Sequence, residues 1–138
     1  MTFKFKRIRI LLSEKNKSSK AIGYARATHN EFENLEEQIK NLKEEGCSLV
    51  FSELISLDAE VKPQLNKAIN YLTKGDQLII TQLDRAFKNK KECLMTINKL
   101  INKDIKFRTL TGFFATNEPL KENSSIFKVL YELDNLED

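Results

Sequence analysis

The chain has 138 residues, of which 41% are hydrophobic and 31% are charged, and its net charge is +3. This length fits one domain, the composition is that of an ordinary globular protein, and no apolar run approaches the roughly 20 residues that span a bilayer. Lysine and arginine interrupt every apolar stretch near the N-terminus, which therefore lacks the shape of a signal peptide. We predict a cytoplasmic protein with no membrane contact.

The first twenty residues differ in charge from the rest. They hold seven bases and one acid, a net charge of +6, whereas residues 21–138 hold 16 bases and 19 acids, a net charge of −3. We predict a basic N-terminal extension or linker over residues 1–20 and one folded domain over residues 21–138. Such an arm suits contact with a DNA backbone. It suits equally well a solvated tail, or codons upstream of the true start.

The residues that commonly bind metals are few. Cys47 and Cys93 stand far apart without a CxxC pair, which is typical of free thiols in a reducing compartment. His29 is the single histidine, which argues against a zinc site built on cysteine and histidine. The sequence also has no glycine-rich phosphate loop and no cluster of acids that would hold two metal ions. We predict that the protein uses no metal and no cofactor.

The predicted elements begin at Ala21. The apolar run Ala21–Ala27 between polar residues is typical of a buried strand. A helix follows, with Gly46 as its C-cap, and its apolar positions at helical spacing are Phe32, Leu35, Ile39 and Leu42. A second strand is predicted within Ser48–Leu54, followed by a polar loop to Lys62.

The middle of the chain repeats this alternation. Pro63 opens a helix, whose predicted core face is Leu65, Ala68, Ile69 and Leu72. Gly75 and Asp76 mark a turn before a third strand over Gln77–Gln82. A loop is predicted over Leu83–Lys91, and the helix after it has one apolar face made of Leu94, Ile97, Leu100 and Ile101. Ile105–Leu110 is the fourth predicted strand.

A long helix is predicted at the C-terminus, after a loop over Thr111–Glu118. Its apolar positions are Ile126, Val129, Leu130, Leu133 and Leu136, with Phe127 and Tyr131 beside them. This apolar surface is wider than one stripe, which indicates two packing surfaces. The second surface belongs either to a partner subunit or to the domain itself.

The strict alternation of strands and helices predicts an α/β fold with three layers. A mostly parallel sheet of four to five strands is expected, with helices on both faces. Functional groups of such folds lie at the carboxyl ends of the strands. The candidate loops therefore follow Ala27, Leu54, Gln82 and Leu110.

Those loops carry one hydroxyl, several cations and a carboxylate, namely Arg26, Thr28, Lys62, Asp84, Arg85 and Lys88. A hydroxyl that attacks and cations that hold oxygens favour metal-free chemistry on a phosphate group. Taken singly, each residue also has an ordinary interpretation. Arg26 suits a surface ion pair, Asp84 and Arg85 a local salt bridge, and Lys88 a solvated basic stretch.

Five ordered segments together resemble one known family. They are Gly23-Tyr24-Ala25-Arg26-Ala27-Thr28, then Gly46-Cys47 with Val50-Phe51 and Glu53, then Lys62-Pro63-Gln64-Leu65, Gly75-Asp76-Gln77-Leu78, and Leu83-Asp84-Arg85-Ala86-Phe87-Lys88. From Ile22 to about Leu136, the chain resembles the catalytic domain of serine site-specific recombinases, the resolvase/invertase family.

The resemblance implies a mechanism without metal or nucleotide. A serine hydroxyl attacks a DNA phosphodiester, forms a 5′-phosphoprotein link and releases a 3′ hydroxyl, while arginines stabilise the transition state. By position, Thr28 would be the nucleophile. The residues that would contact DNA are Arg26, Lys62, Arg85 and Lys88, and Asp84 would complete the catalytic set.

The resemblance also implies assembly, because family members form dimers through the long last helix and these dimers pair into tetramers. The implied interface consists of Ile126, Phe127, Leu130 and Leu133. The expected partners are duplex DNA and either a second copy of this chain or an intact recombinase.

The departures from the family pattern fall on the chemistry. Thr28 replaces serine, and its methyl group restricts rotation of the hydroxyl. Lys62 and Lys88 replace arginines and lose the bidentate fork that fits phosphate oxygens. The sequence runs to Asp138, and we expect no C-terminal DNA-binding domain of the kind that family members add. The leading hypothesis is an impaired strand-cleavage and exchange domain. The alternatives are an inactive dimerisation or regulatory module, or the remnant of a mobile-element recombinase.

Overall fold

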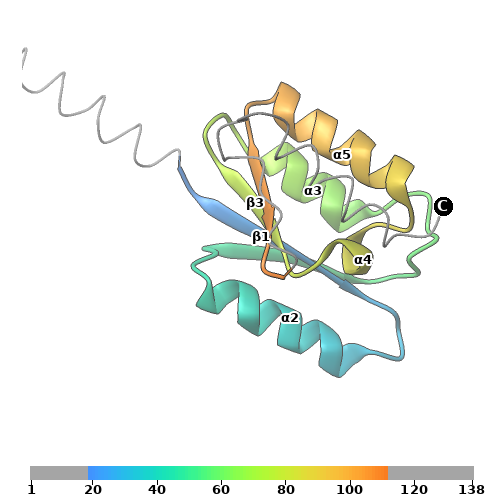
Figure 1. Ribbon diagram of the computed structural model, residues 1–138. Helices are drawn as coiled ribbons and strands as arrows, with labels where there is room; N and C mark the ends of the chain where they lie inside the picture. The colour runs from blue at the N-terminus through green and yellow to red at the C-terminus, as the bar shows by residue number, and fades with distance from the viewer. Residues whose placement is uncertain (1–18, 112–138) are drawn as a thin grey trace, which may run out of the picture.

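The computed structural model describes residues 19–111 as a parallel sheet covered by helices (Figure 1). The elements are β1 (Ala21–Ala27), α2 (Phe32–Glu44), β2 (Leu49–Leu54), α3 (Pro63–Tyr71), β3 (Gln77–Ile80), α4 (Leu83–Ala86), α5 (Lys90–Asn102) and β4 (Lys106–Thr109). The four strands pair in the order β2-β1-β3-β4, and every pair is parallel. The predicted α/β class is confirmed. The predicted long C-terminal helix lies outside the described residues.

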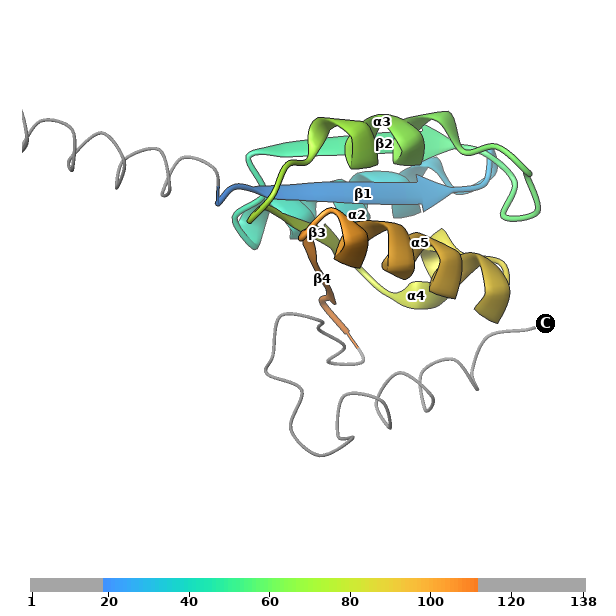
Figure 2. The same ribbon diagram turned by 90° about the horizontal axis from the view of Figure 1, so that it is seen from above.

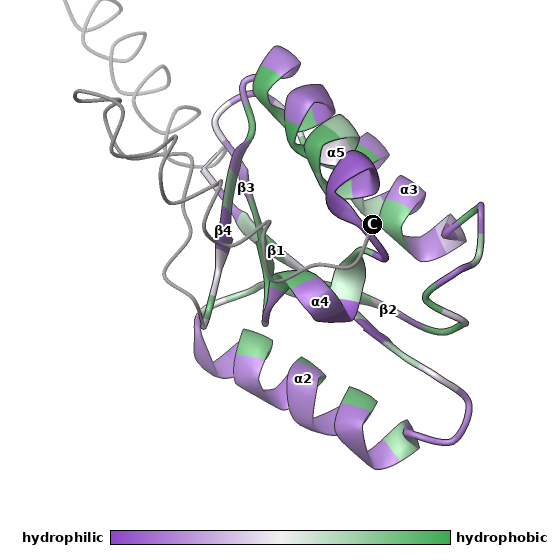
Figure 3. Ribbon diagram, turned by 45° about the vertical axis from the view of Figure 1, so that its right-hand side comes forward, coloured by the Kyte–Doolittle hydropathy of each residue, from purple (hydrophilic) through white to green (hydrophobic). Residues whose placement is uncertain are grey.

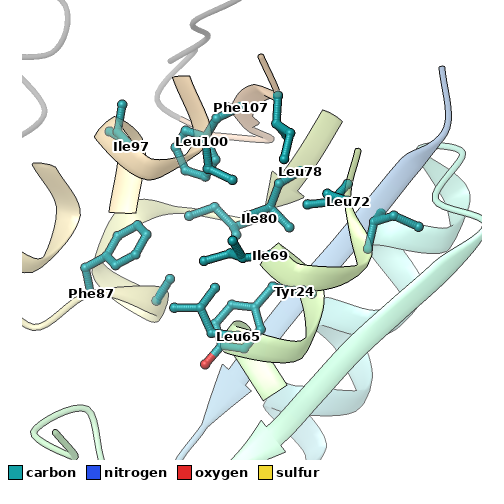
Figure 4. Packing of buried hydrophobic residues seen from close by; sticks show 14 of the residues in the cluster. Tyr24, Leu65, Ile69, Leu72, Leu78, Ile80, Phe87, Ile97, Leu100 and Phe107 are labelled. Atoms are coloured by element: carbon teal, nitrogen blue, oxygen red, sulfur yellow. The ribbon is translucent and has the colours of Figure 1, made fainter. Parts of the chain in front are cut away.

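Helices cover both faces of the sheet (Figures 1 and 2). The alternation of side chains along β1 explains this arrangement, because successive residues of a strand point to opposite faces. Ile22 and Tyr24 join the core beneath α3 and α5, which Figure 4 shows from close by. Ala25 and Ala27 join a second core against α2. A hydrophobic stripe of α2 faces the sheet, as the colours of Figure 3 show.

Gly23 fits the contact between β1 and α2, and Gly46 follows the end of that helix. A Cβ added at Gly23 would lie 3.1 Å from Leu42 Cδ1 and 3.2 Å from Cys47 Sγ, so these side chains would have to shift to make room. Gly46 has a φ of +111°, a left-handed conformation that glycine adopts without strain. The C-cap residue of α2 is Glu45, so the predicted glycine lies one residue beyond the cap.

The chain is already anchored at Lys20, which the sequence assigned to the N-terminal extension. The Lys20 backbone N–H and Nζ both donate to the Asp76 carboxylate, with Nζ 2.6 Å from Oδ2. Thr73 donates two further hydrogen bonds to the same fully buried carboxylate. Burial raises the pKa of Asp76, but these hydrogen bonds outweigh it and hold that pKa below its usual range. The anchor therefore joins the start of β1 to the turn before β3.

The predicted core faces are partly wrong. Phe32 is 54% exposed, Leu94 47% and Ile101 52%. The buried residues of α5 are Cys93, Thr96, Ile97 and Leu100, which lie on one side of the helix. Ile97 and Leu100 were predicted correctly, whereas Leu94 and Ile101 flank this side and face outward. Within the predicted loop Leu83–Lys91 the chain forms the single turn of α4. In the described part of the chain, no helix is long and apolar enough to cross a membrane.

The strand order reverses at β1. From β1 the chain crosses to β2 on one side, and it then returns past β1 to β3 on the other side. In open α/β sheets, a ligand site lies at such a reversal, outside the carboxyl ends of the two strands. Pairing of β1 with β3 runs from Ala21↔Gln77 to Gly23↔Ile79. Beyond that point the two strands diverge, toward Thr28 and Arg85.

Candidate active site

Gln38 occupies the gap between the diverging strands. This buried side chain of α2 accepts a hydrogen bond from the Arg26 N–H at 3.3 Å and donates one to the Arg26 carbonyl oxygen at 2.8 Å. The Thr81 hydroxyl, just beyond β3, donates to the same Gln38 oxygen at 3.4 Å. One amide therefore satisfies the polar groups that the strand ladder leaves open, and it fixes the backbone that carries Arg26.

The Arg26 side chain emerges on the face opposite α2 and is 4% exposed. Its Nε donates to the Arg85 carbonyl oxygen, and its Nη1 donates to the Ile55 carbonyl oxygen at 2.7 Å. Burial lowers the pKa of Arg26, while Glu31 is among the groups that oppose this shift. The guanidinium thus connects β1 to the loop after β2 and to α4. Two of its N–H donors are used in these hydrogen bonds to backbone oxygens.

Thr28 and Arg85 share one carboxylate, that of Glu31. The Thr28 hydroxyl donates to Glu31 Oε1 at 3.0 Å, and the Thr28 N–H donates to the same oxygen at 3.3 Å. Glu31 Oε2 lies 3.8 Å from Arg85 Nη1. The hydrogen bonds from Thr28, helped by the charges of Arg85 and Arg26, hold the pKa of Glu31 below its usual range. At neutral pH the site therefore contains an ionised carboxylate.

Lys62 belongs to a second cluster, centred on Glu92. Its side chain is 3% exposed, and Nζ lies 2.8 and 3.0 Å from the two Glu92 carboxylate oxygens. Nζ also donates to the carbonyl oxygens of Leu57 and Ala59. The Lys88 N–H donates to Glu92 Oε1 at 3.1 Å. The described contacts of the Lys62 ammonium are thus all internal, whereas the sequence predicted contact with phosphate.

The six predicted residues fall into two groups, with one residue apart. Arg26, Thr28 and Arg85 are joined through Glu31 and backbone oxygens, while Lys62 and Lys88 meet at Glu92. Asp84 is exposed on α4. Next to the second group lies a groove of about 540 Å³, whose basic lining residues are Lys62, Lys88, Lys91 and Lys99.

The sequence interpretation missed the three residues that organise these groups, namely Glu31, Gln38 and Glu92. Glu31 stands three residues after Thr28, a spacing at which a turn brings two side chains together. This spacing is the local signal in the sequence that could have indicated the contact. Gln38 and Glu92 act on segments 12 and 30 residues away. Their polar side chains on otherwise amphipathic helices gave no sign of a particular partner.

A further polar chain positions the start of α3. The buried Tyr24 hydroxyl donates to Glu53 Oε2 at 2.7 Å, and burial followed by this hydrogen bond raises the Tyr24 pKa. Glu53 accepts the backbone N–H groups of Gln64 and Leu65, which lie in the first turn of α3. A carboxylate from β2 therefore takes the place of an N-cap side chain. Within residues 19–111, no group of three or more His, Cys, Asp or Glu stands close enough to hold a metal ion.

Comparison with known proteins points to one family. The model of the resolvase N-terminal domain matches residues 21–137. A DNA-invertase of Escherichia phage P1 is 32% identical over 72% of this chain and 53% of its own length. The transposon Tn552 DNA-invertase BinR of Staphylococcus aureus is 31% identical over 81% of this chain and 56% of its own length. The chain thus spans about half the length of these curated relatives.

A solved structure shares the fold. It is that of a resolvase family site-specific recombinase from Streptococcus pneumoniae, which aligns with a TM-score of 0.62 at 14% identity. The alignment covers 84% of this chain and 87% of the other. At this identity the similarity concerns the fold, and it supports the predicted α/β architecture.

Gln38→Leu tests the clamp on Arg26. The change leaves the Arg26 N–H and carbonyl oxygen without their described partner in a buried place, so we expect unfolding to become easier by about 2–4 kcal/mol. Urea denaturation followed by circular dichroism measures this difference. Asn41→Leu, an amide replaced at an exposed position of the same helix, should cost under about 0.5 kcal/mol. Equal effects of the two changes would contradict the clamp.

Glu92→Gln tests the second cluster. The change leaves a buried ammonium without its counter-charge, and we expect a loss of about 3–5 kcal/mol. Combining it with Lys62→Met should recover part of that loss, because neither charge then remains. A double-mutant cycle by urea denaturation measures the coupling between Lys62 and Glu92. Glu60→Gln, which removes an exposed charge from the loop that carries Lys62, is the control. Additive effects of the two changes would show that the ion pair contributes nothing specific.

Proposed function

Because the chain belongs to the serine recombinase family through its resolvase N-terminal domain, we propose that it is a domain for DNA strand cleavage and exchange. The observation that carries this proposal is the arrangement around Thr28. Its hydroxyl stands at the carboxyl end of the central strand β1, at the reversal of the strand order, and one carboxylate links it to Arg85.

The proposed reaction uses the Thr28 hydroxyl as the nucleophile. Its oxygen bonds to the phosphorus of a DNA phosphodiester and the bond to the 3′ oxygen breaks. The hydroxyl proton is released and the departing oxygen takes up a proton, so the products are a 5′-phosphothreonine link and a 3′ hydroxyl. Arg26 and Arg85 stabilise the negative charge that builds up on the phosphate oxygens. Lys88, which lines the groove beside Glu92, adds a further positive charge. Asp84 is the remaining member of the proposed catalytic residues. Reversal of the step on an exchanged strand reseals the DNA, so no cofactor is required.

We further propose that the domain is catalytically impaired. The Thr28 methyl group crowds an in-line attack. Lys88 contributes one ammonium where the family places a guanidinium, and losing one donor to a transition state costs about 10²–10³ in rate. Lys62 is bound by Glu92 and by two carbonyl oxygens, so its charge is largely neutralised. We propose that the domain acts in the cytoplasm, because its proposed substrate is DNA inside the cell.

Thr28→Ser should raise the yield of covalent protein–DNA adduct about 10²-fold, because it removes the methyl group that crowds an in-line attack and keeps the hydroxyl. The substrate is a pool of nicked duplexes with randomised centres, since the nick traps the cleaved state. Nuclease digestion followed by mass spectrometry then identifies a nucleotide linked to residue 28. Thr28→Ala is the matched control and should give none.

Adding Lys88→Arg to Thr28→Ser should raise the yield again. A double variant that binds the duplex pool in a gel-shift assay but forms no adduct would refute the catalytic proposal. Lys62→Arg is left out of this variant, because the buried ion pair with Glu92 makes a loss of folding hard to separate from a loss of chemistry.

A second candidate is a non-catalytic assembly module. The observation that favours it is the internal pairing of cations, because Glu31 faces Arg85 and Glu92 holds Lys62. In this hypothesis the chain forms a homodimer or joins an intact recombinase, through the interface that the sequence predicted. Its residues lie outside the described part of the chain and are Ile126, Phe127, Leu130 and Leu133.

Leu130→Asp should convert the dimer to a monomer, because it puts a charge into the centre of that apolar surface. Light scattering at several protein concentrations measures the mass. Lys128→Asp, a charge reversal between the apolar positions, should leave the dimer in place. A wild-type chain that is monomeric at high concentration would rule out the homodimer.

A further inference from the structure

Glu31 occupies a position that suits a different anion. Its Oε1 accepts both hydrogen bonds from Thr28, and its Oε2 faces Arg85 Nη1 at 3.8 Å. The carboxylate therefore lies between the hydroxyl and the guanidinium, the two groups that handle phosphate in the proposed reaction. Carboxylate and phosphate oxygens both accept charge-assisted hydrogen bonds from such donors.

The helix α2 does not use the Glu31 carboxylate as a cap. Glu31 is the N-cap residue of α2, yet its side chain makes no capping hydrogen bond to the helix. Its side chain is 41% exposed and that of Arg85 is 34% exposed. The carboxylate can therefore swing into solvent, and the guanidinium behind it can be reached from outside.

We propose that the place of the Glu31 carboxylate is the binding position of a DNA backbone phosphate, which displaces Glu31 when it binds. The Thr28 N–H and Arg85 then donate to phosphate oxygens, and the Thr28 hydroxyl loses its present acceptor and faces phosphorus. Before DNA arrives, Glu31 serves as an internal anion that holds Thr28 and Arg85 together.

Repulsion explains why the two anions exchange instead of binding together. A phosphodiester a few ångströms from an ionised carboxylate binds about five-fold more weakly, even with water-like screening. Two donors of Arg26 are already engaged by the carbonyl oxygens of Ile55 and Arg85, which leaves fewer of its N–H groups for a second anion. Removing the Glu31 charge should therefore strengthen phosphate binding at this place.

The identification of the phosphate as DNA rests on the proposed function, but the exchange can be measured without any cleavage. The full chain, labelled with ¹⁵N, is titrated with inorganic phosphate at constant ionic strength, and the Thr28 amide and Arg85 Nε–H signals are followed. Glu31→Gln is compared with Glu33→Gln, which removes the same charge from an exposed position in the first turn of α2.

We expect Glu31→Gln to bind phosphate about five-fold more tightly than Glu33→Gln, with the Thr28 amide among the signals that move most. Glu31→Ser, which supplies a good N-cap residue, should behave like Glu31→Gln and guards against a folding defect. Equal affinities of the Glu31 and Glu33 variants would overturn the proposal. So would a Thr28 amide that stays in place at saturating phosphate.

A short duplex of arbitrary sequence separates the two sources of phosphate. We expect its affinity to rise more for Glu31→Gln than for Glu33→Gln, as with free phosphate. A gain for inorganic phosphate without a gain for the duplex would overturn the assignment to DNA. If the gain appears with both probes while Thr28→Ser forms no covalent adduct, the binding site stands and the cleavage proposal fails.

Discussion

The site depends on the side-chain amide of Gln38, which holds β1 at the point where it leaves β3. The pairing of β1 with β3 ends at Gly23↔Ile79, and the buried backbone groups beyond that point need other hydrogen-bond partners. Gln38 meets this need by bonding both backbone groups of Arg26 and by reaching Thr81. The divergence of the two strands toward Thr28 and Arg85 is thus stabilised by a side chain that belongs to α2.

Charge pairing then divides the cations of this edge into two kinds. Glu92 encloses Lys62 within the protein, where the ion pair holds the loop before α3 against α5. Glu31 makes a looser and more exposed contact with Arg85. The buried pair of Lys62 and Glu92 stabilises the fold, whereas in the exposed pair another anion can replace Glu31 beside Arg85. This contrast is why the predicted cations are unequal candidates for contact with DNA, although the sequence placed them at the same edge.

Sequence patterns predicted the strands, the glycine after α2 and the edge that carries Arg26 and Thr28, because strand periodicity and the rule for parallel sheets depend on local order. They failed where a contact joins distant segments. Glu92 follows Lys62 by thirty residues, and no local pattern couples the two. The predicted apolar face of α5 included Leu94, whereas the buried side runs through Cys93 and Thr96. The helix α4 has four residues, too few for a periodicity to show.

The anchor between Lys20 and Asp76 bears on how the molecule can be handled. It lies at the opposite end of β1 from Thr28, and eight residues of extended chain separate the two by about 25 Å. A fluorophore or affinity handle joined ahead of Lys20 is therefore attached to the domain at the edge remote from Thr28. Such a label would let immobilised protein be presented to DNA with its reactive edge facing outward.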